Sequence, residues 1–184
     1  AKKSGFELAI VSSFRSFDRQ LQIWNDKVSG KRPVLDSCGV KLDISLLSDD
    51  DLLFSILKWS AIPGTSRHHW GTDLDIYDKS AVNIEYDVKL TDDEVLNGGV
   101  FSPLHDWLDN EIKNKKSFNF FRPFERKEMV PYSAFKKPPM ISDERWHISH
   151  KPTSSFYSRE INESKLHHFF TNQNDILLKD LILR

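Results

Sequence analysis

The most informative stretch of this sequence is residues 66–78, which read SRHHWGTDLDIYD. Its second half alternates polar and apolar side chains, with Asp73 and Asp75 on one face and Leu74 and Ile76 on the other. A period of two predicts a β-strand whose apolar face packs against a core. The acidic face then remains free to present carboxylates.

Further elements are expected on both sides of this strand. Apolar residues at helical spacing predict helices that begin near Phe17, after Ser48 and at Ser102, and the capping box Thr91–Glu94 predicts a short one. Alternating or apolar runs predict strands or extended segments at residues 7–12, 84–90, 118–121 and 145–149, and the helical pattern returns over roughly 158–184. The sequence therefore predicts one α+β domain over residues 1–184.

Composition and charge exclude several classes of protein. The chain has 13 Phe, 5 Trp and 4 Tyr among 184 residues, too many large apolar side chains for a disordered protein. With 26 basic and 27 acidic residues its net charge is −1, which disfavours nucleic acid as a partner. The longest apolar runs are too short to span a bilayer. A single cysteine, Cys38, cannot form an internal disulfide.

The first residues indicate that the chain continues upstream. Residues 1–6 read AKKSGF, which is typical of the end of a helix, with basic side chains before the glycine Gly5. We therefore expect that a preceding segment has been removed by processing or truncation. The sequence gives no indication of the oligomeric state.

Two histidine-rich segments contain the ligand types that zinc prefers. His68 lies before a glycine-containing turn and Asp75 after it, so a loop donor and a strand donor can converge. In the segment ERWHISH, His147 and Ser149 share one strand face, and Glu144 is three residues ahead of that histidine. Two imidazoles, one carboxylate and an additional glutamate are the components of a hydrolytic zinc site. The residues alone leave open that these side chains only pack in the core or lie on the surface.

Three motifs resemble those of known metallopeptidases. Residues 66–75, SRHHWGTDLD, resemble the SxHxxGxAxD motif of the LAS metallopeptidases, a group with lysostaphin-type enzymes, D-alanyl-D-alanine carboxypeptidases and the hedgehog signalling domain. Residues 144–147, ERWH, resemble the second motif of that group. Residues 12–16, SSFRS, followed by Gln20, resemble the SG[YF]RSx₄Q element of the VanY-type D-alanyl-D-alanine carboxypeptidases. Two positions depart from these motifs: Asp73 replaces a small residue, and Ser13 replaces a glycine.

The resemblance implies a fold and a role for each motif residue. The expected fold is of the LAS type, with a small antiparallel sheet that carries the zinc site and helices around it. One Zn²⁺ per chain is expected on His68, Asp75 and His147, whereas the neighbouring His69 and His150 are not expected to be ligands. The other expected roles are general base for Glu144, oxyanion or substrate binding for Arg15, and substrate contacts for Ser66, Gln20 and Asp73.

The activity that the resemblance implies is hydrolysis of the terminal D-Ala-D-Ala bond of peptidoglycan stem peptides, with release of D-alanine. Peptidoglycan lies outside the bacterial cytoplasmic membrane, so the expected location is the periplasm or the cell surface. Two alternatives stay open: an endopeptidase of the same fold that cuts within peptidoglycan peptides, and a non-catalytic zinc module that binds wall peptides or a protein partner. Glu144 favours an enzyme, because a binding module needs no general base.

Overall fold

The computed structural model describes residues 1–36, 39–124 and 143–184, so Cys38 lies outside the described residues. These residues form two compact units, which we describe separately. Unit 1 comprises residues 1–14, 70–124 and 143–156, and unit 2 comprises residues 15–36, 39–69 and 157–184. The chain passes directly from one unit to the other at residues 14–15 and 69–70.

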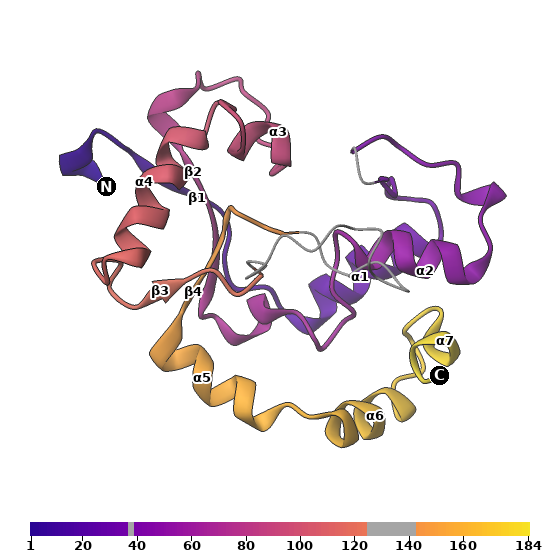
Figure 1. Cartoon of the computed structure of the whole chain (residues 1–184). Helices are drawn as coiled ribbons and strands as arrows, with labels where there is room; N and C mark the ends of the chain where they lie inside the picture. Colours follow the sequence, from indigo (N-terminus) through magenta and orange to yellow (C-terminus); the bar gives the residue numbers. More distant parts are fainter. Residues whose placement is uncertain (37–38, 125–142) are drawn as a thin grey trace, which may run out of the picture. The chain divides into compact units, whose positions relative to one another are not determined.

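Unit 1 is built on an antiparallel four-stranded sheet (Figure 1). Its strand order is β1 (Leu8–Ser12), β2 (Asp73–Asp78), β4 (His147–His150) and β3 (Phe120–Phe121). The central pair places Asp73 opposite Ser149 and Asp75 opposite His147. This pairing confirms the predicted antiparallel sheet, with the acidic face of β2 beside the histidine of β4.

The apolar face of the sheet packs on a helix. Unit 1 contains α3 (Asp92–Val95) and α4 (Ser102–Lys113), whose second residue is a proline, as is common at a helix start. Ile76 of β2, Ile148 of β4 and Leu108 of α4 form the buried cluster between them. Alternation in the strands and the i, i+4 pattern in α4 thus meet in one core, as the sequence predicts.

The strand predicted for residues 84–90 is wrong. The alternating residues there form irregular backbone, and Leu90 has the left-handed φ of 56°. Instead of a neighbouring strand, the buried carboxylate of Glu94 accepts the backbone N–H groups of Lys89 and Leu90 at 2.7–3.2 Å and the hydroxyl of Tyr86 at 3.0 Å. A single side chain therefore satisfies donors that a strand would have paired in a sheet.

Two extended segments are shorter than predicted. Only Phe120–Phe121 of the segment 118–121 forms a strand, because Phe118 and Asn119 have left-handed φ angles of 53° and 65°. β4 begins at His147 rather than at residue 145, because a turn precedes it in which the His147 N–H donates to the Glu144 carbonyl at 3.0 Å. This turn brings the glutamate back towards the histidine.

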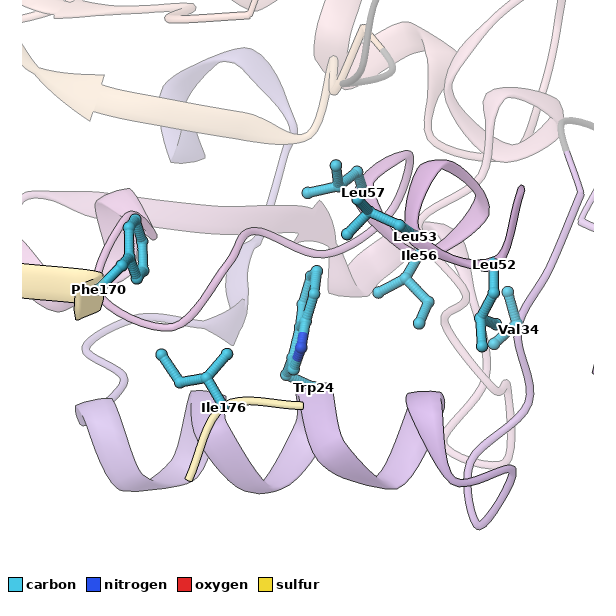
Figure 2. Packing of buried hydrophobic residues seen from close by; sticks show 8 residues of the cluster. All are labelled: Trp24, Val34, Leu52, Leu53, Ile56, Leu57, Phe170 and Ile176. Carbon is cyan, nitrogen blue, oxygen red and sulfur yellow. The ribbon is translucent and has the colours of Figure 1, made fainter. Parts of the chain in front are cut away.

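Unit 2 is helical and has its own core. It contains α1 (Phe17–Val28) and α2 (Asp49–Leu57), capped by the side chains of Ser16 and Ser48, and near the C-terminus α6 (Glu163–Thr171) and α7 (Lys179–Ile182). The fully buried Trp24 of α1 packs at the centre, and its indole N–H donates to the Leu177 carbonyl at 2.9 Å (Figure 2). The remaining buried members of this cluster are Val34, Leu52, Leu53, Ile56, Leu57, Phe170 and Ile176.

The helical C-terminal part begins earlier than predicted. α5 (Lys151–Glu160) follows β4 without a loop, whereas the periodicity predicts helix only from about residue 158. Short 3-10 turns occur at Lys2–Ser4, Ile44–Leu46, Arg67–Trp70 and Lys79–Ala81, and the first of them ends at Gly5 in the left-handed conformation. Within the described residues, every helix is too short or too polar to cross a membrane.

Candidate active site

The paired strands β2 and β4 bring two predicted metal ligands together in unit 1. Asp75 and His147 are direct partners in the sheet, and both side chains are buried. Nδ1 of His147 lies 3.0 Å from Oδ1 of Asp75 and 3.5 Å from Oε2 of Glu144. One imidazole nitrogen therefore faces two carboxylates. Asp75 is the expected metal ligand, and Glu144 is the expected general base.

The opposite nitrogen of the same ring faces a third carboxylate. Nε2 of His147 lies 2.8 Å from Oδ1 of Asp73, a residue with no exposed surface. The other oxygen of Asp73 accepts hydrogen bonds from the hydroxyls of Ser149 at 3.0 Å and Thr72 at 2.5 Å. Asp73 is thus directed into the sheet, towards the histidine.

The carboxylates determine the charge of His147. Burial opposes the charged imidazolium, but the hydrogen bond to Asp73 and the nearby carboxylates of Asp75 and Glu144 raise the pKa of His147 to about 9. Three carboxylates around one imidazole make this part of unit 1 attractive to cations.

An ion-pair cluster anchors the segment that carries Glu144. The guanidinium of the next residue, Arg145, lies 2.6 Å from Asp106 and 2.5 Å from Asp109, both on α4, and also donates to the Val95 carbonyl at 2.7 Å. Arg122 reaches Asp109 from the other side at 2.6 Å. The forked geometry of arginine suits such multiple contacts and holds the turn before β4 against α4.

A small cavity lies beside Glu144. It has a volume of about 180 Å³, and its walls include Glu144 and Asp143 together with the two arginines of the ion-pair cluster, Arg122 and Arg145. Glu144 therefore lies at the edge of a space that a small polar group can enter, while its carboxylate approaches His147.

Unit 2 organises a second group of predicted site residues around the N-terminus of α1. Nη1 of Arg15 donates to Oε1 of Gln20 at 2.8 Å, and the amide of Gln20 donates to the Ala61 carbonyl at 2.7 Å. Gln20 is completely buried, so its contact with Arg15 comes from inside the unit. This hydrogen bond holds the guanidinium end of the arginine side chain against the helix.

The two adjacent histidines of the motif have different surroundings in unit 2. The Nε2 atom of His69 accepts the N–H of Gly64 at 3.1 Å, and its Nδ1 lies 2.6 Å from the Arg15 carbonyl, to which it donates. His68 is buried, and its backbone carbonyl accepts the N–H of Arg15 at 3.1 Å. Ser66, also buried, bonds through its carbonyl to the N–H of His69 at 3.1 Å.

The predicted site residues thus fall into two groups, each held together inside its own unit. Unit 1 contains Asp73, Asp75, Glu144 and His147, and unit 2 contains Arg15, Gln20, Ser66 and His68. The sequence did not indicate that Arg145 anchors Glu144 or that His69 anchors Arg15. The only signal in the sequence was that Arg145 and His69 each lie inside a motif. The groups that they contact, on α4 and at Arg15, lie far from them in the chain.

The buried histidine, the carboxylate beside it and the glutamate at a cavity edge are the residue types that zinc peptidases use. Comparison with known families agrees with this class. Residues 1–153 match the VanY family, described as D-alanyl-D-alanine carboxypeptidase, and the chain belongs to this family.

Individual relatives add detail to this assignment. An uncharacterised protein of Haemophilus influenzae is 48% identical over 62 residues, which are 34% of this chain and 42% of that protein. Another match to an uncharacterised protein of that organism is 30% identical over 113 residues, 61% of this chain and 78% of the relative. The chain therefore aligns with less than half of the length of the first of these matches.

Solved structures of VanY proteins are also similar to this chain. VanYB in complex with D-alanine-D-alanine has 20% identity and a TM-score of 0.48, with 95% of this chain and 76% of that chain covered. VanY from the VanB-type resistance cassette in complex with Zn(II) has 22% identity and a TM-score of 0.47, with 88% and 71% covered.

Proposed function

We propose that this chain is a zinc-dependent D-alanyl-D-alanine carboxypeptidase that removes the terminal D-alanine from peptidoglycan stem peptides. The observation that carries the proposal is the arrangement in unit 1, where Nδ1 of His147 faces Asp75 at 3.0 Å and Glu144 at 3.5 Å. Membership of the VanY family supports the same reaction. Its substrate lies outside the cytoplasmic membrane, so the protein is proposed to act in the periplasm or at the cell surface.

The proposed ligands are His68, Asp75 and His147, one zinc ion per chain. They offer two imidazole nitrogens and one carboxylate oxygen, a donor set typical of catalytic zinc. The local charge fits a dication, because the buried imidazole of His147 is surrounded by three carboxylates. His68 belongs to unit 2, and we propose that both units of the chain act as one domain in which it completes the set.

When bound, zinc would lower the pKa of water and polarise the carbonyl of the scissile bond. Glu144 would accept a proton at its carboxylate from the attacking water and deliver it to the leaving amine. Glu144 is suited to this role, since the turn before β4 holds its main chain and the residue borders a cavity.

Arg15 is proposed to bind the substrate carbonyl or its developing oxyanion. Its guanidinium is positioned by Gln20 at 2.8 Å, and its carbonyl by His69 at 2.6 Å. Gln20 is completely buried, and in this proposal it contributes to substrate binding indirectly, by holding the guanidinium of Arg15. Ser66 remains a proposed contributor to the substrate-binding region. Asp73 has no exposed surface, so its proposed contribution to substrate binding is indirect, through His147 at 2.8 Å.

Mass spectrometry of muropeptides tests this function. Zinc-loaded protein is incubated with muropeptides that carry pentapeptide stems, and we expect each stem to lose the mass of one D-alanine. Cleavage within the stem or within a cross-link would instead identify an endopeptidase. Unchanged muropeptides, from protein that contains zinc, would support a binding module.

A further inference from the structure

Asp73 is the most unusual residue of the site, because the corresponding motif has a small residue at this position. A completely buried carboxylate is costly unless it is hydrogen-bonded. Here three partners within unit 1 hold it: the imidazole of His147 at 2.8 Å, and the hydroxyls of Ser149 at 3.0 Å and Thr72 at 2.5 Å. The carboxylate is therefore fixed in one orientation.

The register of the sheet explains why Asp73 reaches this histidine. Asp73 is the direct partner of Ser149, and His147 lies two residues before Ser149 in β4, on the same strand face. The carboxylate extends diagonally between the two, with one oxygen on the serine hydroxyl and the other on Nε2. Diagonal neighbours on one face are within reach of long side chains.

This contact determines which nitrogen of His147 is available to a cation. If Nε2–H donates to Asp73, then Nδ1 presents its lone pair on the side where Asp75 lies at 3.0 Å. Metal-binding histidines commonly donate their second ring N–H to a carboxylate, which fixes the tautomer and the ring orientation and makes the ligand more basic.

We propose that Asp73 is a positioning residue, which holds the ring and the tautomer of His147 so that Nδ1 serves as the zinc donor. This inference rests on the proposed function, since it takes His147 as a ligand. Thr72 and Ser149 act one step further out, by holding the second oxygen of Asp73.

Zinc affinity is the first test, measured by competition with a fluorescent chelator and without any substrate. We expect Asp73→Ala to bind zinc about 10–100-fold more weakly than the wild type. Asp73→Asn retains an oxygen that can accept the Nε2–H, so its affinity should lie between the two. The control is Asp78→Asn, another buried aspartate of β2, which bonds instead to the backbone of Glu7 and to Ser80, and it should bind zinc like the wild type.

The second test is the tautomer of His147 in the zinc-loaded wild type, read from ¹⁵N–¹H spectra of ¹⁵N-labelled histidine. A proton on Nε2 is expected, and a proton on Nδ1 would overturn the inference whether or not the variants fold. Equal zinc affinity of folded Asp73→Ala and wild type would overturn it too, and leave the proposed function intact. A wild type without zinc affinity would overturn both.

Discussion

Glu144→Gln removes one negative charge from the site and keeps the size of the side chain. The glutamine amide cannot accept the proton that the carboxylate at 3.5 Å from Nδ1 of His147 is proposed to take. Loss of a general base lowers kcat by about 10²–10⁴, which corresponds to about 2.7–5.5 kcal/mol of transition-state stabilisation. Because Glu144 is not a proposed ligand, zinc should remain bound.

The assay measures D-alanine released from a pentapeptide that ends in D-Ala-D-Ala, together with zinc content by elemental analysis of the same sample. Asp143→Asn is the matched control: it removes a charge from the neighbouring residue, which lines the same cavity. We expect this variant to keep both zinc and activity. The comparison separates the role of one carboxylate from a general loss of negative charge.

Two results would contradict the reasoning. If Glu144→Gln lost its zinc in parallel with its activity, Glu144 would be a ligand and the assignment of roles would be wrong. If it retained wild-type kcat with zinc bound, another group would have to accept the proton.

Three further predictions concern the ligands, the oxyanion and the packing of α4. His147→Ala should lose both zinc and activity, because one of three proposed ligands is removed; retention of stoichiometric zinc would contradict this. Arg15→Ala should keep zinc while kcat falls about 10²–10³-fold, and a change in KM alone would instead indicate ground-state binding. His105 of α4 is completely buried, and burial followed by the charges of Arg122 and Arg145 lowers its pKa to about 3. The stability that its neutral form contributes is therefore complete above pH 6.5 and is lost as the pH falls towards 3. Urea unfolding should show that the wild type loses about 2–3 kcal/mol more than His105→Leu between pH 7 and 4.5, whereas equal losses would refute the assignment.

The sheet was readable from the sequence where short-range alternation decides the structure. Asp73 and Asp75 alternate with Leu74 and Ile76, so a period of two was enough to predict β2 and its two faces. The same rule failed at residues 84–90, where the alternation is real. The carboxylate of Glu94 binds the backbone donors there, and periodicity contains no information about such a side-chain contact.

The sequence was enough to predict which residues belong to the candidate site, but not which of their side chains contact one another. The motifs indicated Asp75, Glu144 and His147, and the sheet places all three close together in unit 1. Asp73 and His147 are 74 positions apart in the chain, and their contact depends on the register of the two strands that carry them. Register of this kind is set by tertiary packing, so the sequence left the direction of the Asp73 side chain open.

The pair of histidines in the first motif has a consequence for metal removal. His69 uses both ring nitrogens on main-chain groups, the N–H of Gly64 and the carbonyl of Arg15. Its lone pair is therefore already engaged, and it does not compete with its neighbour His68 for a cation. Arg15 is held within its own unit by the His69 ring, the His68 carbonyl and the Gln20 side chain. Removal of the metal with a chelator should therefore leave that arginine in its place.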